Sequence, residues 1–186
     1  KTDANKNKPI IDEYFNEYCK QDFIVANMEL SKEELDDLIY NVKRELNNLV
    51  DFCRLYNVNY HDSSQVISLA CTWCFELKNY KDIGMKNFPM IIESAINKIK
   101  ELFENPIIEN GLPTYEIDFT DMVYFPVYYE MNVPYTQREY MDYVLVDETQ
   151  DLSVLSQMFL RRVTNGKTRY ICVGDKNQSI YAFARS

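Results

Sequence analysis

Two short, mostly apolar runs, residues 143–147 and 169–173, most constrain what this chain can fold into. Each run is rich in β-branched residues, and each is followed at once by acidic and amide side chains. A continuous apolar run of this length is typical of a parallel strand that is covered on both faces. Ligands of open α/β sheets bind just beyond the carboxyl ends of such strands. The pattern therefore predicts two parallel strands whose polar residues gather at one edge of the sheet.

The first predicted strand ends in Asp147 and Glu148. A carboxylate just past a strand can hold Mg²⁺ beside a nucleotide, as the Walker B aspartate of P-loop NTPases does. The neighbouring Glu148 could then polarise the water that attacks a γ-phosphate. A strand-end Asp-Glu pair that is simply solvated is the alternative, because acidic residues commonly end strands.

The second predicted strand favours the nucleotide interpretation. It ends in Gly174 and Asp175, and Gln178 follows at a short interval. A neutral amide at that place can donate a hydrogen bond to a phosphate oxygen and so report whether the phosphate is present. Tyr181 and Phe183 come next, and bases of nucleic acids can stack on their flat rings.

Three stretches of the second half, taken together, carry a resemblance to a known family. Val146–Asp151 reads Val-Asp-Glu-Thr-Gln-Asp, Val173–Phe183 begins Val-Gly-Asp-Lys-Asn-Gln, and Ile117–Met122 holds an Asp-Phe-x-Asp sequence. They resemble, respectively, motif II, motif III and the acidic helix before motif II of the UvrD/Rep/PcrA-like superfamily 1 DNA helicases. Their order and spacing are also similar to those of the family.

The resemblance implies a role for each matching residue near the nucleotide. Asp147 would bind Mg²⁺, and Glu148 would be the catalytic base. Gln178 would sense the γ-phosphate of ATP and couple it to DNA. Gln150 and Asp151 would link the nucleotide site to neighbouring motifs.

The resemblance also implies a contact with single-stranded DNA through Tyr181 and Phe183, although the family often has Trp at the second of these positions. The chain departs from the pattern at residues 184–186, where Ala-Arg-Ser replaces the Arg-Gly-Ala of many members. That departure puts one motif III contact in doubt. Thr149 occupies a position that varies in the family.

The tripeptide Gly166-Lys167-Thr168 ends like a phosphate-binding loop but does not fit one. The spacing Gly-x-x-x-x-Gly-Lys-Thr would need glycine where this chain has Arg161. Such a loop must also follow a strand and open a helix, so that the helix N-terminus meets the phosphates. Here the tripeptide follows a predicted helix, residues 153–163, and opens a strand. We interpret Gly166 as the C-cap of that helix.

The sequence pattern of the first half of the chain predicts an all-helical module. Apolar stripes and capping residues predict helices over residues 10–20, 31–56, 62–77 and 86–103. Residues 23–25 could form a short extended segment, and Asn105-Pro106 and Asn110-Gly111 are helix breakers. A further helix should begin at Asp118 and end or kink at Pro126.

The fold class we expect is mixed α and α/β, with an all-helical module followed by a partial RecA-like P-loop NTPase fold with a short parallel sheet. The resemblance assigns residues 1–112 to a helical 1B-like subdomain. It assigns residues 113–186 to the part of the RecA-like 1A domain that carries motifs II and III.

The composition of the chain limits the kinds of partner and cellular environment that we expect for it. The net charge of −9 argues against broad electrostatic capture of nucleic acid by this segment alone. Five cysteines at irregular spacing favour a reduced, cytoplasmic setting over a disulfide framework. Cys71 and Cys74 lack a second ligand pair at a zinc-binding spacing, so we expect a buried helical pair. No apolar run approaches the ~20 residues of a membrane span.

The resemblance implies that the parent protein is an ATP-dependent DNA helicase. Such an enzyme couples hydrolysis of ATP, with Mg²⁺, to translocation on single-stranded DNA and unwinding of fork DNA. Since motif I and the second RecA-like domain would lie elsewhere in the same helicase chain, we expect these residues alone to be inactive. The alternative is a non-catalytic adaptor with a degenerate RecA-like tail, which would have no need of intact Asp147, Glu148 and Gln178. A helicase-nuclease fusion stays open.

Overall fold

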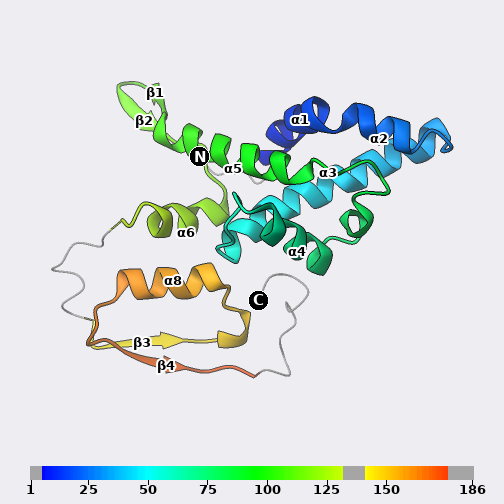
Figure 1. The fold of residues 1–186 in the computed structure, drawn as a ribbon. Coiled ribbons are helices and arrows are strands. Elements are labelled where there is room, and N and C mark those ends of the chain that lie inside the picture. The colour runs from blue at the N-terminus through cyan, green and yellow to red at the C-terminus, as the bar shows by residue number, and fades with distance from the viewer. Residues whose placement is uncertain (1–5, 132–140, 176–186) are drawn as a thin grey trace. The chain divides into compact units, whose positions relative to one another are not determined.

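The computed structural model describes residues 6–131 and 141–175 (Figure 1). The chain divides into two compact units, the first comprising Lys1–Cys53 and Val58–Asp118, the second Arg54–Asn57 and Phe119–Ser186. The predicted mixture of helical and α/β structure is confirmed, because helices dominate and one short sheet is parallel. Within the described residues no helix is both long enough and apolar enough to cross a membrane.

The first unit is built mainly from helices. They are α1 (Asn7–Tyr18), α2 (Lys20–Ala26), α3 (Lys32–Leu55), α4 (Ser63–Trp73), the 3-10 turn η1 (Glu76–Asn79) and α5 (Phe88–Glu104). α1 packs along α5. Val42, Leu46 and Leu49 of α3 are fully buried, as are Ile92 and Ile96 of α5. This three- and four-residue spacing is the apolar face that the sequence pattern predicted.

Two helix starts are capped as predicted. The backbone N–H of Ser31 donates to Oε2 of Glu34 at 2.9 Å, and the N–H of Glu34 donates to the Ser31 hydroxyl at 3.3 Å. The carboxylate of Asp62 accepts a hydrogen bond from the N–H of Ser64 at 3.0 Å. These contacts satisfy amides that have no partner inside the first helical turn, which fixes where α3 and α4 begin.

Residues 23–25 belong to α2, so the prediction of an extended segment there is wrong. Phe15, Cys19 and Phe23 are all buried and lie four residues apart. A four-residue repeat keeps side chains on one helix face, and a strand would have alternated them. The N–H of Phe23 donates to the Cys19 carbonyl at 2.9 Å, a four-residue step that a helix makes and a strand does not.

A β-hairpin follows α5, where the sequence indicated only helix breakers. Strands β1 (Ile107–Glu109) and β2 (Leu112–Thr114) pair antiparallel. The turn residues Asn110 and Gly111 both have positive φ, 53° and 79°. An Asn-Gly pair with both residues in this region is the preferred two-residue hairpin turn. The first unit is therefore not entirely helical.

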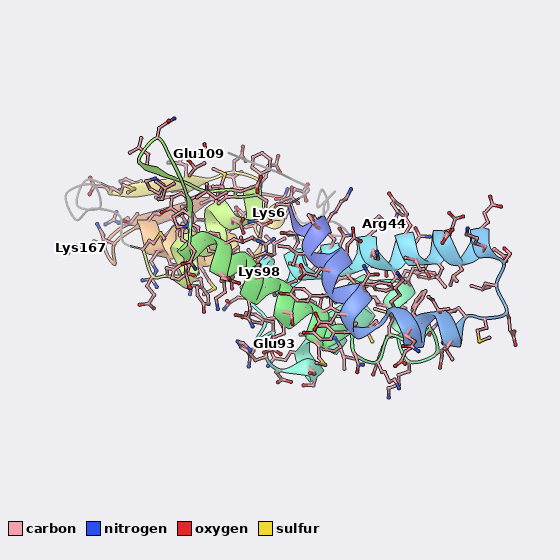
Figure 2. All side chains as sticks on the ribbon, turned by 90° about the horizontal axis from the view of Figure 1, so that it is seen from above. Lys6, Arg44, Glu93, Lys98, Glu109 and Lys167 are labelled. Carbon is pink, nitrogen blue, oxygen red and sulfur yellow. The ribbon has the colours of Figure 1, made fainter. Side chains whose placement is uncertain are left out.

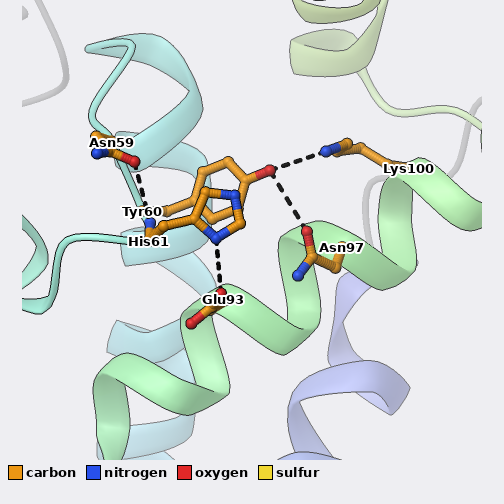
Figure 3. Close-up of polar contacts among 6 residues, drawn as sticks. All are labelled: Asn59, Tyr60, His61, Glu93, Asn97 and Lys100. Carbon is orange, nitrogen blue, oxygen red and sulfur yellow. Dashed lines mark hydrogen bonds and ion pairs between the residues drawn. The ribbon is translucent and has the colours of Figure 1, made fainter.

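A polar cluster joins α5 to the segment between α3 and α4 (Figure 3). Nδ1 of His61 lies 2.6 Å from Oε1 of Glu93. The hydroxyl of Tyr60, which is nearly buried, accepts from Nζ of Lys100 at 2.9 Å and donates to Oδ1 of Asn97 at 3.4 Å. The only histidine of the chain thus contacts a carboxylate at the surface.

The second unit holds the parallel sheet. Its elements are α6 (Phe119–Tyr128), β3 (Tyr143–Val146), the 3-10 turn η2 (Thr149–Asp151), α8 (Val154–Val163) and β4 (Arg169–Cys172). β3 pairs with β4 in parallel, from Tyr143 opposite Arg169 to Val146 opposite Cys172. The connecting α8 runs alongside the strand pair and packs on α6 (Figure 1). The predicted strand-helix-strand order is confirmed.

Two details of the helix ends in this unit differ from the predictions: α6 does not end at Pro126, and Gly166 is not the C-cap of α8. α6 continues past Pro126 to Tyr128, because the N–H of Tyr129 still donates to the carbonyl of Phe125 at 2.9 Å. α8 ends at Val163, as predicted, but its C-cap is Thr164 and not Gly166, and the hydroxyl of Thr164 donates to the Leu160 carbonyl at 2.8 Å. That side chain satisfies a carbonyl of the last turn, so no left-handed glycine is needed there.

Arg54 and Asp121 form a buried ion pair within the second unit. Both side chains are fully excluded from solvent, and NH1 of Arg54 contacts Oδ1 of Asp121. The guanidinium also lies 6.0 Å from the centre of the Tyr124 ring. A buried charge requires such a partner, since an isolated one would strongly destabilise the fold.

Candidate nucleotide site

The two parallel strands end side by side, as the sequence predicted. Val146 and Cys172 are register partners, and the N–H of Val173 donates to the carbonyl of Val146 at 2.8 Å. The residues that follow each strand, beginning with Asp147 and Gly174, therefore leave the sheet at the same edge. In open α/β sheets this carboxyl edge is where ligands bind.

Thr149 joins the segment after β3 to the end of β4 through hydrogen bonds. Its N–H donates to the carbonyl of Val173 at 3.0 Å, and its hydroxyl donates to the same carbonyl at 2.9 Å. Sequence reasoning gave Thr149 no role. A hydroxyl residue three positions past a strand was the available signal, although the partner carbonyl lies 24 residues away and no local pattern identifies it.

Gln150 bridges the two strand ends through its side-chain amide. Oε1 accepts a hydrogen bond from the N–H of Asp175 at 3.0 Å, and Nε2 donates to Oε2 of Glu148. Glu148 has left-handed backbone angles, φ 49° and ψ 45°. For a residue other than glycine this conformation is unfavourable and persists only where neighbouring contacts hold it. Gln150 thus orients the Glu148 carboxylate and ties it to the segment after β4.

A side chain at Gly174 would displace the Gln150 side chain from its position. A Cβ atom at this position would stand 2.2 Å from Oε1 of Gln150 and 3.0 Å from the backbone nitrogen of Thr149. The absence of a side chain allows the two segments to approach closely. The sequence analysis noted Gly174 only as the residue that ends a strand.

Asp147 and its neighbours place carboxylate oxygens at this edge, and carboxylates are ligands that Mg²⁺ prefers. Asp147 and Glu148 are exposed, and Oδ1 of Asp147 accepts from the N–H of Glu148 at 2.9 Å. Oδ1 of Asp151 is buried and has no hydrogen-bond partner among the described residues. Within the same residues no group of three or more His, Cys, Asp or Glu could hold a metal by itself. Mg²⁺ commonly takes one or two carboxylates and completes its shell with water and substrate phosphates, so this donor set fits.

Gln178, Tyr181 and Phe183 lie outside the described residues, which reach Asp175 in this part of the chain. Their roles stay predictions. The described chain does bring Asp147, Glu148, Gln150 and Asp151 together on one short segment beside Asp175.

The tripeptide Gly166-Lys167-Thr168 stands at the amino end of β4, at the opposite end of the strand from Asp175 (Figure 2 labels Lys167). The N–H of Lys167 donates to Oδ1 of Asn165 at 2.8 Å, and the Thr168 hydroxyl donates to the carbonyl of Met141 at 2.8 Å. These are turn contacts. The tripeptide opens no helix, so its exclusion as a phosphate loop is confirmed.

The cysteine prediction is half wrong. Cys74 is buried but Cys71 is exposed, because Cys71 lies on the outer side of α4 and Cys74 follows its last turn. Burial raises the pKa of Cys74 to about 12, and the nearby Glu45 carboxylate adds to the shift. A thiol with so high a pKa is a poor nucleophile and a poor metal ligand at neutral pH.

Comparison with protein families identifies one match that spans almost the whole chain. The description of the matching family is UvrD/REP helicase N-terminal domain, and the match covers residues 2–186. Comparisons with curated proteins and with solved structures gave no significant match.

Proposed function

This chain belongs to the UvrD/REP helicase family, and from that premise we propose that it is part of an ATP-dependent enzyme that moves along single-stranded DNA and unwinds duplex DNA. The observation that carries the proposal is the shared edge of β3 and β4. There Gln150 joins Glu148, which follows β3 and Asp147, to Asp175, which follows β4, through its two side-chain hydrogen bonds.

In this proposal the carboxylate of Asp147 holds Mg²⁺, which would supply charge neutralisation at the phosphates of ATP. Glu148 accepts a proton from the attacking water. Its carboxylate is suited to that task because it is exposed at the strand edge, and because Nε2 of Gln150 fixes its direction. A base must be held within hydrogen-bond reach of the proton it takes.

Gln150 could couple the binding of single-stranded DNA to the orientation of Glu148. Gln178 would sense the γ-phosphate, and Tyr181 and Phe183 would stack on bases of single-stranded DNA. All three follow Asp175, whose N–H donates to Gln150. A movement of this segment on binding DNA would therefore alter the hydrogen bond that orients Glu148. Asp151, the other linking residue, would use its unpaired buried oxygen toward a neighbouring motif.

We assign residues 1–112 to a 1B-like helical subdomain and residues 113–186 to part of the RecA-like 1A domain. The division of the chain into compact units between Asp118 and Phe119 supports this assignment. The 186-residue polypeptide contains no Gly-x-x-x-x-Gly-Lys-Thr sequence, so we expect no ATP hydrolysis from it alone. The proposed setting of the whole enzyme is the cytoplasm.

The test uses the protein expressed from its complete gene. We expect its ATPase activity to rise with single-stranded DNA, and Glu148→Gln to lower the turnover by about 100-fold or more, since a general base is lost. Binding of single-stranded DNA should survive this change. A complete protein with no DNA-stimulated ATPase would contradict the proposal and favour the adaptor. Turnover of ATP by the 186-residue polypeptide, abolished by Glu148→Gln, would contradict its predicted inactivity.

A further inference from the structure

The first unit carries a small pocket between α1 and α3, far along the sequence from Asp147. Its volume is about 280 Å³. Lys8 and Asp12 line it from α1, and Tyr40, Lys43, Arg44 and Asn47 line it from α3. Figure 2 shows Arg44 on α3 where this helix passes α1.

The pocket carries an excess of positive charge. Three cations less one carboxylate leave a net charge of +2 on its lining, in a chain whose net charge is −9. Lys43 has partners of its own, because its Nζ lies 2.8 Å from Oδ1 of Asp12 and 4.9 Å from the centre of the Phe15 ring. Among the described residues, Lys8 and Arg44 make no hydrogen bond or ion pair. These two cations are therefore available to an anion.

The remaining lining residues of the pocket suit an organic group attached to that anion. Ile11 contributes an apolar surface and is itself only 1% exposed. Tyr40 offers a phenol ring at the rim. Oδ1 of Asn47 is buried and has no hydrogen-bond partner within the part of the chain that the structure describes. Asn47 thus adds a polar side chain to the lining beside the apolar surface of Ile11.

We propose that this pocket binds a small phosphomonoester that carries a flat organic group. A phosphomonoester has a charge of about −1.5 to −2 at pH 7, which matches the two available cations. The guanidinium of Arg44 can engage two phosphate oxygens at once. A phosphodiester chain carries one charge at each phosphate and runs through an open groove, whereas this pocket receives a terminal group. Its volume lies near the lower end of ligand pockets, about 300–1,000 Å³.

The inference goes beyond the helicase proposal, because none of the pocket residues belongs to the nucleotide site. The experiment is a calorimetric titration of the 186-residue polypeptide with phenyl phosphate, in EDTA so that Mg²⁺-dependent binding elsewhere is silent. Phenyl sulfate, a monoanion of similar shape, is the matched ligand. We expect saturable binding of phenyl phosphate and at least about tenfold weaker binding of phenyl sulfate, the loss of one charge-assisted interaction.

Two variants with opposite expected effects on the affinity for phenyl phosphate test the roles of the pocket residues. The double variant Lys8→Gln/Arg44→Gln should weaken binding of phenyl phosphate by at least about tenfold. Asp12→Asn should strengthen it, because it removes the only carboxylate and releases Lys43. Lys32→Gln is the matched control, since it removes a cation from the same helix about 18 Å from Arg44 and should change nothing.

Three results would overturn the inference. Equal affinities for phenyl phosphate and phenyl sulfate would show that the pocket does not select a dianion. Unchanged binding in both Lys8→Gln/Arg44→Gln and Asp12→Asn would place the ligand elsewhere. Displacement of phenyl phosphate by a single-stranded oligonucleotide that lacks terminal phosphates would show that these cations read a phosphodiester backbone. The affinity gain in Asp12→Asn remains decisive even if the double variant fails to fold.

Discussion

Oε1 of Gln150 accepts a hydrogen bond from the backbone of Asp175 at 3.0 Å, across 25 residues of sequence. The contact exists because Gly174, the residue before Asp175, presents no side chain toward Gln150. This contact is one of those that hold the two strand ends together, and it gives the first prediction.

Gly174→Ala should loosen the strand edge. The added Cβ would meet Oε1 of Gln150 at 2.2 Å, so the glutamine must leave its position or the segment after β4 must shift. Loss of the hydrogen bond between Gln150 and Asp175 should cost about 0.5–1.5 kcal/mol. Urea denaturation of the 186-residue polypeptide measures the change in the free energy of unfolding.

Gly166→Ala is the matched control for that substitution. Nothing lies within 4 Å of a Cβ at residue 166, and its backbone is not in the left-handed region. We expect a change within about 0.5 kcal/mol. Equal effects of the two substitutions would mean that the close approach at Gly174 does not matter.

Gln150→Glu should reduce catalysis without a comparable loss of stability. The substituted carboxylate cannot donate to Glu148, and it places a second negative charge beside the proposed base. We expect the ATPase turnover of the complete protein to fall at least about tenfold, with its affinity for single-stranded DNA retained. Gln157→Glu on α8, whose amide donates only to the Leu152 carbonyl at 3.4 Å, is the control. Normal turnover in Gln150→Glu would separate Gln150 from catalysis.

The features predicted from the sequence are those that depend on residues close together in the chain. The features it missed are contacts between segments that only the folded structure brings together. Ser31 and Glu34 cap a helix through bonds three residues apart, and Asp147 follows a strand whose apolar run is visible in the sequence. The bonds from Thr149 to Val173 and from Asp175 to Gln150 join segments that only the folded sheet brings together. The hairpin at Asn110-Gly111 is different, since its turn signal was present and was interpreted only as a helix break.

Removal of either partner of the Arg54–Asp121 pair should strongly destabilise the chain. Both side chains are fully buried, so Asp121→Asn removes a carboxylate partner of a buried guanidinium and should cost about 3–5 kcal/mol. Replacement of both partners, Arg54→Met/Asp121→Leu, should cost less than Asp121→Asn, because no buried charge remains. Chemical denaturation of the three proteins measures this order. Lys98→Gln, which breaks the exposed Lys98–Glu101 pair, should leave the unfolding midpoint unchanged, and an equal loss there would argue against burial as the cause.

The buried thiols should make the fold sensitive to alkaline pH. Burial raises the pKa of Cys19 to about 11 and that of Cys74 to about 12, whereas an unfolded thiol titrates near 8.5. The native state therefore keeps protons that the unfolded state has released. The contribution of these thiols is fully present below pH 8 and declines as the pH rises toward 11, by at most about 1.4 kcal/mol per unit for each thiol. Urea denaturation at pH 7.5, 9 and 10.5 measures the decline, which should be smaller in Cys74→Ala than in the exposed-site control Cys172→Ser. Equal pH dependence in these two variants would show that the Cys74 thiol titrates alike in the folded and unfolded chain.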